Sequence, residues 1–424
     1  MNVTVIGSGG REHALSHKIK ESELLDNLYI IPGNPGTANL GENINLDILD
    51  HQALVNFCKE KNIDLVVIGP EQPLEKGLAD ILRENEIKVF GPGKEAAEIE
   101  SSKSFAKSLM KIAGVPTANY LKFTNAMYDH AKDYLRGKKY PCVIKADGLA
   151  AGKGVRVCNN PEEAENAIKD IFVTKVYGSA GDSALIEEFL EGEEISVFAI
   201  TDGENIICLP PAQDHKRVGD NDTGKNTGGM GAYAPTPFVN EELMEEIKTT
   251  IIAPTLKALN EEGKKFIGCL YAGLILTADG PKVIEFNCRF GDPETQVVLP
   301  LLEGDFLKLL YSAAYGNLEP NAVSYSQRTA VCVVAASGGY PDEYEKGFEI
   351  SGLDNLSEDV IIYHAGTKDE GGKILTNGGR VFGVTSFLEN NDLLEAKQKA
   401  YETINSIHFR NIYFRKDIAD KALK

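Results

Sequence analysis

The 424-residue sequence contains no tryptophan, only seven cysteines and no apolar stretch long enough to cross a membrane. A membrane-spanning helix needs roughly 18 consecutive apolar residues, so we expect a soluble chain with no membrane partner. The cysteines are dispersed and form no Cys-x-x-Cys pair, which predicts reduced core residues rather than disulfides. Because a strand pattern follows Met1 directly, without a secretory leader, the sequence predicts a cytoplasmic protein.

Positive charge is also scarce: 44 Lys and Arg residues face 63 Asp and Glu residues, for a formal net charge of -19. Such a charge repels nucleic-acid backbones, so no nucleic-acid partner is expected. A phosphate-bearing substrate would need local Lys and Arg residues, and those in glycine-rich stretches are the candidates. The composition, 42 % hydrophobic and 25 % charged, is that of a globular protein, and the length suggests about three structural units.

The first hundred residues alternate short apolar runs with amphipathic segments, which predicts a doubly wound parallel sheet in an α/β fold. The expected strands are residues 3–6, 28–31, 65–68 and 89–90. Glycine or proline turns follow the first three strands. Since parallel strands bind ligands beyond their carboxyl ends, these three turns are predicted to border one crevice.

Further along the chain the pattern changes to that of a small inserted domain, which follows a helix predicted near residues 101–112. Its strands 142–145 and 155–158 flank a glycine-rich loop, 146–154, of a kind that often acts as a lid. The remaining predicted strands are 195–200, 206–209, 271–276, 282–286, 330–335, 360–364 and 381–385, with a helix near 392–406. A loop with five glycines, 214–233, interrupts this series.

The segment 283–292 is the most informative in the sequence. Side chains two apart on a strand share a face, so Glu285, Asn287 and Arg289 are predicted to project together. A carboxylate beside an amide oxygen suits Mg²⁺, and an adjacent guanidinium can hold a phosphate or carboxylate. The alternative is an ordinary salt-bridged strand end. Burying three polar groups on one face would then be costly, which favours a functional role.

The loop 148–154 fails the Walker pattern, because three residues rather than four separate Gly148 from Gly152 and Gly154 follows Lys153. We interpret it as a hairpin whose backbone N–H groups cover phosphates, with Lys145 on the adjoining strand.

The opening loop, 7–13, is similar to a dinucleotide fingerprint, but Glu12 stands where the third glycine should be. No acidic residue follows the second strand either, which weakens the case for NAD. A phosphate at the helix N-terminus, assisted by Arg11, remains compatible with the loop, and so does a plain strand–helix turn. The histidines show no metal-ligand spacing.

Four longer motifs resemble one family. They are GSGGREHA (7–14), KADGLAAGKGV (145–155), QDHKRVGDNDTGKNTGGMGAY (213–233) and EFNCRFGDPETQ (285–296). In order and spacing they closely resemble the phosphoribosylamine–glycine ligases (glycinamide ribonucleotide synthetases), which are ATP-grasp enzymes of purine synthesis, and the resemblance covers nearly the whole chain.

The resemblance implies an ATP-grasp fold divided into five parts. These are an N-terminal doubly wound α/β substrate-binding domain (1–100), a connecting helix and linker (101–120), a small lid domain (121–190), a central catalytic domain (191–325) and a C-terminal α+β domain (326–424).

The implied reaction uses ATP with Mg²⁺ or Mn²⁺. The glycine carboxylate attacks the γ-phosphate to form glycyl phosphate, and the amine of 5-phosphoribosylamine then displaces phosphate. The products are glycinamide ribonucleotide, ADP and phosphate. Catalysis would consist of positioning and charge neutralisation, without a covalent enzyme intermediate.

The resemblance also implies residue roles. ATP would be held by Lys103, Lys145, Gly152, Lys153, Gly154, Glu187, Leu190 and Glu194, with Glu187 and the backbone near Leu190 at adenine and Glu194 at ribose. Substrates would be held by Gly9, Gly10, Arg11, Glu12, Asp214, Lys216, Arg217, Arg289, Gly291 and Asp292. Glu285 and Asn287 would bind the metal. Arg289, Lys145 and Asp214 are the expected catalytic residues.

Residues 271–276 lack the additional metal-binding carboxylate of many ATP-grasp enzymes, which leaves ligation of a second metal open. The sequence ends soon after residues 415–418, so a monofunctional enzyme is expected, as a monomer or a weak dimer. The alternatives are another ATP-grasp carboxylate ligase, a nucleotide-sensing binding protein without turnover, and an NAD-dependent oxidoreductase.

Overall fold

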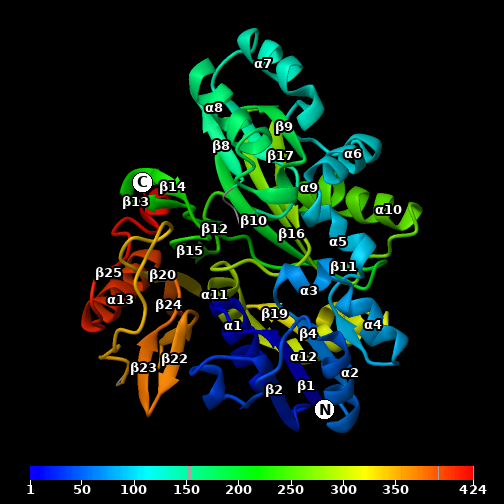
Figure 1. The fold of residues 1–424 in the computed structure, drawn as a ribbon. Coiled ribbons are helices and arrows are strands. Elements are labelled where there is room, and N and C mark those ends of the chain that lie inside the picture. Colours follow the sequence, from blue (N-terminus) through cyan, green and yellow to red (C-terminus); the bar gives the residue numbers. More distant parts are fainter. Residues whose placement is uncertain (151–153, 355, 390, 424) are drawn as a thin grey trace.

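The computed structural model describes residues 1–150, 154–354, 356–389 and 391–423. Figure 1 shows an N-terminal body at the bottom, a small body at the top that contains helices α7 and α8, and a C-terminal body on the left. A central sheet lies between them. Among the described residues, no helix is long and apolar enough to cross a membrane.

The N-terminal body contains a five-stranded parallel sheet in the order β3-β2-β1-β4-β5. Its strands are β1 (Asn2–Gly7), β2 (Asn27–Pro32), β3 (Glu42–Asn43), β4 (Leu65–Ile68) and β5 (Val89–Phe90). Its helices are α1 (Gly10–Lys20), α2 (His51–Glu60), α3 (Glu71–Glu75) and α4 (Leu78–Glu84). Val5 packs in one hydrophobic core and Val66 in another, so both faces of the sheet are buried. The predicted doubly wound sheet is confirmed.

The small body is an antiparallel sheet in the order β6-β9-β7-β8, covered by two helices. Its elements are β6 (Tyr120–Thr124), α7 (Tyr128–Arg136), β7 (Cys142–Ala146), β8 (Val155–Cys158), α8 (Pro161–Phe172) and β9 (Ser183–Glu188). Ile144 on the sheet and Ile168 on α8 lie in a core of its own. The chain enters this body through α6 (Lys103–Ala113), which ends at Gly114 with a left-handed φ of 69°.

The central sheet is antiparallel, in the order β11-β10-β16-β17. Its strands are β10 (Glu193–Thr201), β11 (Ile206–Cys208), β16 (Gly268–Thr277) and β17 (Gly280–Asn287). The helices α5 (Lys94–Ser101), α6, α9 (Glu241–Ile247) and α10 (Ala253–Glu261) share its core with helices of the N-terminal body. This packing joins helices on both sides of the inserted domain to one sheet.

The C-terminal sheet has the order β12-β15-β20-β24-β21, and β25 also pairs with β20. Its strands are β12 (Gln213–Asp214), β15 (Gly231–Ala234), β20 (Thr329–Ser337), β21 (Val360–His364), β24 (Arg380–Leu388) and β25 (Ile412–Tyr413). The helix α13 (Leu393–Ser406) packs on β20 and β24. Two strands of this sheet, β12 and β15, therefore come from the stretch that the sequence places in the central domain.

Several shorter elements connect these bodies. They are the hairpin β13 (Arg217–Gly219) and β14 (Thr223–Asn226), the helices α11 (Thr295–Val298) and α12 (Phe306–Tyr315), the pair β18 (Leu302–Gly304) and β19 (Val323–Tyr325), and the hairpin β22 (Thr367–Glu370) and β23 (Lys373–Thr376). Both α11 and α12 contact α1: α12 links the N-terminal body to the central sheet, and α11 links it to the C-terminal sheet.

Candidate active site

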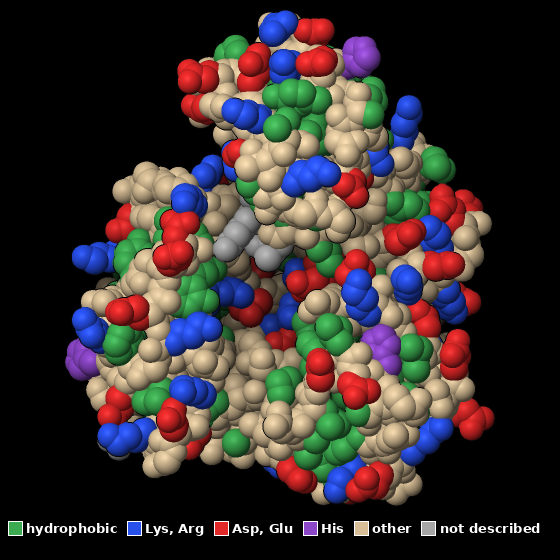
Figure 2. All heavy atoms as spheres, viewed as in Figure 1, with side chains coloured by type: hydrophobic (Ala, Val, Ile, Leu, Met, Phe, Trp, Pro, Cys, Tyr) green, Lys and Arg blue, Asp and Glu red, His purple; other side chains and the backbone are tan. Residues whose placement is uncertain are grey.

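Figure 2 shows a hollow between the small, central and C-terminal bodies, in which lysine, arginine and acidic side chains gather. A cavity of about 380 Å³ also lies at the carboxyl edge of the N-terminal sheet, where Gly9, Arg11 and Asp292 line it together with Pro70. This edge is the place at which the sequence predicts a ligand crevice.

Three buried charged side chains meet where the small body joins α6. Nζ of Lys145 on β7 lies 3.1 Å from Oε2 of Glu187 on β9 and donates to the backbone oxygen of Ile284 at 3.0 Å. Nζ of Lys107 on α6 lies 3.2 Å from the same carboxylate oxygen. The other oxygen of Glu187, Oε1, is buried and accepts no hydrogen bond within the described part of the chain.

The remaining residues predicted at the nucleotide lie around this group. Nζ of Lys103 donates to the backbone oxygen of Gly148 at 3.1 Å, at the start of the glycine-rich loop. Leu190 is half-buried in the segment between β9 and β10. A Cβ atom on Gly154 would lie 2.8 Å from Cβ of Ala150, so only glycine fits there without displacement. The predicted Gly152 and Lys153 lie outside the described residues.

Glu285 stands among positive charges at the end of β17. Nζ of Lys216 lies 3.7 Å from Oε1 of Glu285 and 3.2 Å from Oε2 of Glu194. Burial would raise the pKa of Glu285, but Lys216, Lys145, Lys103 and Arg289 together lower it below its usual value. The carboxylate is therefore ionised, and its 32 % exposed side chain is accessible to a ligand.

The oxygen donors here fit a hard divalent cation that is shared with a polyphosphate. Glu285 and Asn287 are both half-buried, as the two-residue spacing predicts, and the Asn287 amide makes no hydrogen bond to a described residue. No group of three or more His, Cys, Asp or Glu side chains that could enclose a metal occurs among the described residues. Mg²⁺ commonly takes only one or two protein oxygens and completes its shell with water and phosphate, so this pair suffices.

A second pair of acidic residues lies beside this point. Glu294 is buried, and its Oε1 accepts hydrogen bonds from Tyr271 at 2.8 Å and Ser196 at 3.0 Å. Burial and the charge of Glu294 raise the pKa of Asp214 well above its usual value. Oδ1 of Asp214 is buried and has no partner among the described residues. The pair can accept hydrogen bonds from a small cationic group.

The Arg289 guanidinium is held by two acidic residues of the N-terminal half. Its Nη2 donates to Oε1 of Glu100 at 2.8 Å, and its Nε to Oε2 of Glu71 at 3.3 Å. Nη1 donates to the backbone oxygen of Phe290 at 3.2 Å. The arginine predicted to steady a phosphoryl group is thus fixed by the protein before any ligand binds.

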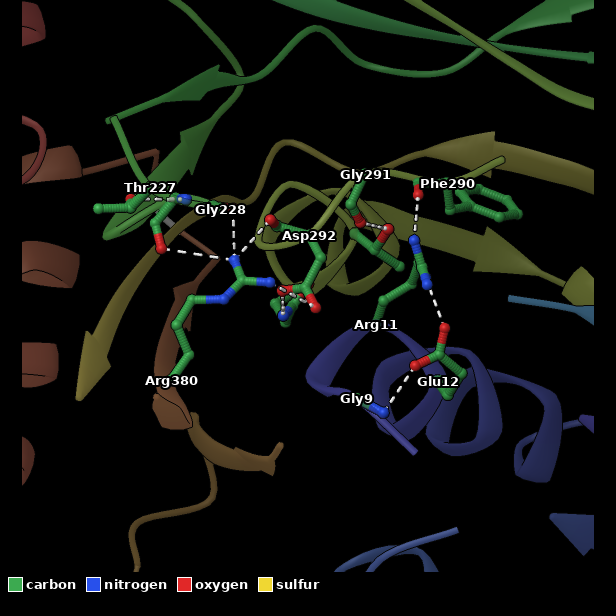
Figure 3. A network of polar contacts seen from close by, with 12 residues as sticks. Gly9, Arg11, Glu12, Thr227, Gly228, Phe290, Gly291, Asp292 and Arg380 are labelled. Atoms are coloured by element: carbon green, nitrogen blue, oxygen red, sulfur yellow. Dashed lines mark hydrogen bonds and ion pairs between the residues drawn. The ribbon is translucent and has the colours of Figure 1, made fainter. Parts of the chain in front are cut away.

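Glu12 organises the N-terminal loop from a buried position. Its Oε2 accepts from the backbone N–H of Gly9 at 2.7 Å, and its Oε1 accepts from Nε of Arg11 at 2.5 Å (Figure 3). Cβ atoms on Gly7 and Gly69 would lie 2.4 Å and 2.1 Å from its side chain. Glu12 therefore fills the space between two glycine turns and orients Arg11.

A further arginine, Arg380 at the start of β24, joins the C-terminal sheet to the loop after β17 (Figure 3). Its Nη2 lies 3.2 Å from Oδ2 of Asp292, and its Nη1 donates to the backbone oxygens of Asp292 and Gly228. Burial would raise the pKa of Asp292, but Arg380 and then Arg11 lower it. Three sequence-distant segments meet at this carboxylate.

The structure brings most of the predicted residues to this cleft. Arg217 differs, because its Nη1 donates to the backbone oxygen of Gly224 within the hairpin β13–β14. Gly10 and Gly291 serve packing, since Cβ atoms there would lie 2.7 Å and 2.5 Å from the side chains of Gln296 and Glu294.

Five charged residues at the cleft were not predicted from the sequence: Lys107, Glu71, Glu100, Glu294 and Arg380. Lys107 had a detectable signal, because it lies four residues after Lys103 and so shares its helix face. Glu294 lies inside a motif that was recognised.

Comparison with known proteins finds relatives that match nearly the whole chain. Residues 1–100, 101–295 and 330–421 match family models described as the N domain, the ATP-grasp (A) domain and the C domain of phosphoribosylglycinamide synthetase. A phosphoribosylamine–glycine ligase of Halalkalibacterium halodurans is 48 % identical, with 100 % of this chain and 97 % of the relative covered. The phosphoribosylamine–glycine ligase of Rhodopirellula baltica is 46 % identical, with 100 % of this chain and 98 % of the relative covered.

Among solved structures, a phosphoribosylamine–glycine ligase of Thermotoga maritima superimposes with a TM-score of 0.85 at 34 % identity, covering 99 % of this chain and 100 % of that chain. The ATP-grasp fold expected from the sequence is confirmed.

Proposed function

Because the chain belongs to the phosphoribosylamine–glycine ligase family, we propose that it joins glycine to 5-phosphoribosylamine with ATP, giving glycinamide ribonucleotide, ADP and phosphate. The observation that carries the proposal is the group of cations around Glu285. The pKa of this carboxylate is lowered by four cations, Lys216, Lys145, Lys103 and Arg289. Because four positive charges exceed the charge of one carboxylate, the site favours an additional anionic ligand. ATP with Mg²⁺ or Mn²⁺ is such a ligand.

In this proposal the triphosphate lies between Lys103, Lys145 and the loop 148–154, and adenine lies against Glu187 and the backbone near Leu190. Glu194 holds the ribose. Glu285 and Asn287 hold the divalent cation, which when bound neutralises phosphate charge and orients the γ-phosphate.

The chain's residues then serve the two chemical steps by positioning and charge. The glycine carboxylate attacks the γ-phosphate and ADP leaves with the bridging oxygen, while Lys145 and Arg289 stabilise the charge of the transferring phosphoryl group. Glu71 and Glu100 keep the Arg289 guanidinium in place, so little reorganisation is needed during the reaction. The amine of 5-phosphoribosylamine then attacks the carbonyl carbon of glycyl phosphate, and phosphate leaves with the bonding electrons.

The two acceptors occupy different parts of the cleft. The ammonium group of glycine fits the acidic pair Asp214 and Glu294, because the buried Oδ1 of Asp214 has no hydrogen-bond donor among the described residues. The ribose phosphate of 5-phosphoribosylamine fits the cavity at the N-terminus of α1, because the positive end of the helix dipole favours an anion. Arg11 and Asp292 line the same cavity.

The proposal is tested by measuring ADP release with ATP and Mg²⁺ while the two acceptors are added separately and then together. Phosphoribosylamine is generated in place from ribose 5-phosphate and ammonia. We expect ADP release to require both acceptors. If ATP binds but the pair of acceptors does not stimulate turnover, the proposed substrates are wrong although the ATP-grasp fold remains.

Replacement of Arg11 by alanine is expected to raise the KM for phosphoribosylamine by about tenfold while the KM for ATP changes by less than about twofold. The substitution removes the partner of the buried Glu12 carboxylate and loosens the loop that lines the cavity. Steady-state kinetics with Lys20→Ala, an exposed position on the same helix, provide the control. A larger rise in the KM for ATP would contradict this placement.

Replacement of Asp214 by asparagine is expected to raise the KM for glycine by about tenfold, because the amide brings an N–H donor toward the glycine ammonium. The KM for ATP should stay within about twofold. Asp279→Asn, in the exposed turn between β16 and β17, is the matched control. An unchanged KM for glycine would place the amino acid elsewhere.

A further inference from the structure

Glu187 has an asymmetric environment that the proposed nucleotide site does not by itself explain. Both nearby ammonium groups, Nζ of Lys107 at 3.2 Å and Nζ of Lys145 at 3.1 Å, approach the same oxygen, Oε2. Oε1 is buried without a hydrogen-bond partner among the described residues. A buried unpaired carboxylate oxygen costs folding free energy, so its retention indicates a ligand that donates to it.

The hydrogen-bond donors of the Lys107 ammonium group are all used within this group of residues. Its Nζ also donates to Oγ1 of Thr117 at 2.8 Å and to the backbone oxygen of Ala118 at 3.4 Å. An ammonium group has three N–H donors, and these contacts together with Glu187 use all three. Lys107 therefore has no donor left for a phosphate group, and any effect on a bound nucleotide passes through Glu187.

The burial of the group shows how strongly the protein maintains it. The side chains of Lys107, Lys145 and Glu187 are only 3 %, 5 % and 3 % exposed. Burial lowers the pKa of Lys107 to about 8, although Glu187 acts to raise it. Two lysine ammonium groups lie against the same oxygen of Glu187, and a carboxylate in such an ion pair accepts hydrogen bonds and donates none.

We propose that Lys107 is a positioning residue for base selection: together with Lys145 it holds Oε2 of Glu187, so that Oε1 is left as an acceptor that favours adenine over guanine. This inference rests on the proposed nucleotide site. The exocyclic amino group of adenine donates a hydrogen bond, whereas the corresponding oxygen of guanine is an acceptor. Two acceptors would then face each other without a proton, which disfavours GTP.

The inference is tested by titrating the purified enzyme with ATP and with GTP in a calorimeter, with Mg²⁺ and without glycine or phosphoribosylamine. We expect Lys107→Met to weaken ATP binding by about tenfold and GTP binding by less than about twofold, so that the preference for ATP narrows. Both nucleotides carry the same triphosphate, so their ratio isolates the base. Lys111→Met, exposed one turn further along α6, should change neither affinity.

A second variant keeps the test decisive if Lys107→Met fails to fold. Glu187→Gln preserves the shape of the side chain but offers an N–H donor, so we expect GTP to bind more tightly and ATP more weakly. An equal loss of both nucleotides in Lys107→Met, or an unchanged ratio in Glu187→Gln, would overturn the inference. Because these titrations need no ligase turnover, a failure of the proposed substrates would leave their outcome unaffected.

Discussion

Replacement of Glu285 by alanine is expected to lower kcat by roughly 10³-fold at a normal Mg²⁺ concentration, because the metal and the γ-phosphate lose their protein carboxylate. The thermal unfolding midpoint should change by less than about 2 °C. The Glu285 side chain is 32 % exposed and its nearest cation, Lys216, is 3.7 Å away, so little packing is lost. Steady-state kinetics and a thermal melt measure the two quantities.

Metal-free ATP provides an internal check on the same variant. Removing one negative charge from among four cations should leave the binding of metal-free ATP unchanged or tighter, while the gain in affinity from added Mg²⁺ is lost. Glu261→Ala, an exposed position on α10, is the matched control. Activity within about tenfold of the parent enzyme at normal Mg²⁺ would show that Glu285 is not a metal ligand.

Local sequence patterns were sufficient to predict most of the strands and helices. The predicted strand 65–68 matches β4, a continuous apolar run that ends at Gly69, and the predicted strand 155–158 matches β8, an alternating run that begins after Gly154. Asp392 was placed at the start of the last helix, and its side chain indeed accepts from the backbone N–H of Glu395 as an N-cap. Such signals lie within a few residues of the element they define.

The strand pairing of residues 213–234 could not be predicted in the same way. β12 pairs with β15, and β15 pairs with β20 across about a hundred residues of sequence. A two-residue strand such as β12 has no measurable periodicity, and its partner is chosen by tertiary packing. The loop 214–233 with its five glycines was recognised in the sequence, but the pairing of β12 and β15 with the C-terminal sheet was not predicted.

The acidic residues around Arg289 were not predicted for the same reason, because their contacts join segments that are distant in the sequence. Glu71 begins α3 and Glu100 lies in the last turn of α5, both more than 180 residues before Arg289. In the sequence both are ordinary acidic residues of a helix surface. Only the folded chain shows that Glu100 is buried and accepts from both Cys288 and Arg289. Glu12 is the converse case, because its mismatch to a glycine fingerprint was visible while its structural cause, the space between two glycine turns, was not.

These contacts suggest how the cleft tolerates so much charge in a chain of net charge -19. Three cations of the cleft are each paired with a carboxylate: Lys216 with Glu194, Lys145 with Glu187, and Arg289 with Glu100. Such pairs keep the side chains in fixed positions without a ligand, which is the preorganisation that electrostatic catalysis requires.

Replacement of Arg415 by methionine is expected to destabilise the hairpin β13–β14 by about 3 kcal/mol, because Asp417 loses its cation and Asp222 keeps only Lys421. The Arg415 side chain is 0 % exposed. Its Nη1 donates to Oδ1 of Asp222 and to the backbone oxygen of Arg217, while Nε and Nη2 donate to Asp417. The segment that the sequence treated only as the end of the chain therefore fixes the hairpin β13–β14 that follows Lys216.

Hydrogen exchange of residues 217–226 measures this effect directly, since the chain has several bodies and need not unfold in one step. We expect exchange there to accelerate by about 10²-fold in Arg415→Met, and the neighbouring exposed Lys416→Met to exchange like the parent. Unchanged protection in Arg415→Met would show that β13–β14 is held by other contacts.

The stability of the hairpin β13–β14 at acid pH provides an independent test of the Arg415 contacts. Burial would raise the pKa of Asp417, but hydrogen bonds from Arg415 and from the backbone of Asn221 lower it from 3.8 to about 2. A carboxylate with a lowered folded-state pKa adds stability above its unfolded pKa, and this stability is lost as the pH falls from about 4 to about 2. In Arg415→Met most of that dependence should disappear, because the cation that keeps Asp417 ionised is gone. If the hairpin of the variant still loses protection over this pH range as the parent does, the acid dependence comes from Asp222, whose pKa Lys421 also lowers, and not from the Arg415–Asp417 pair.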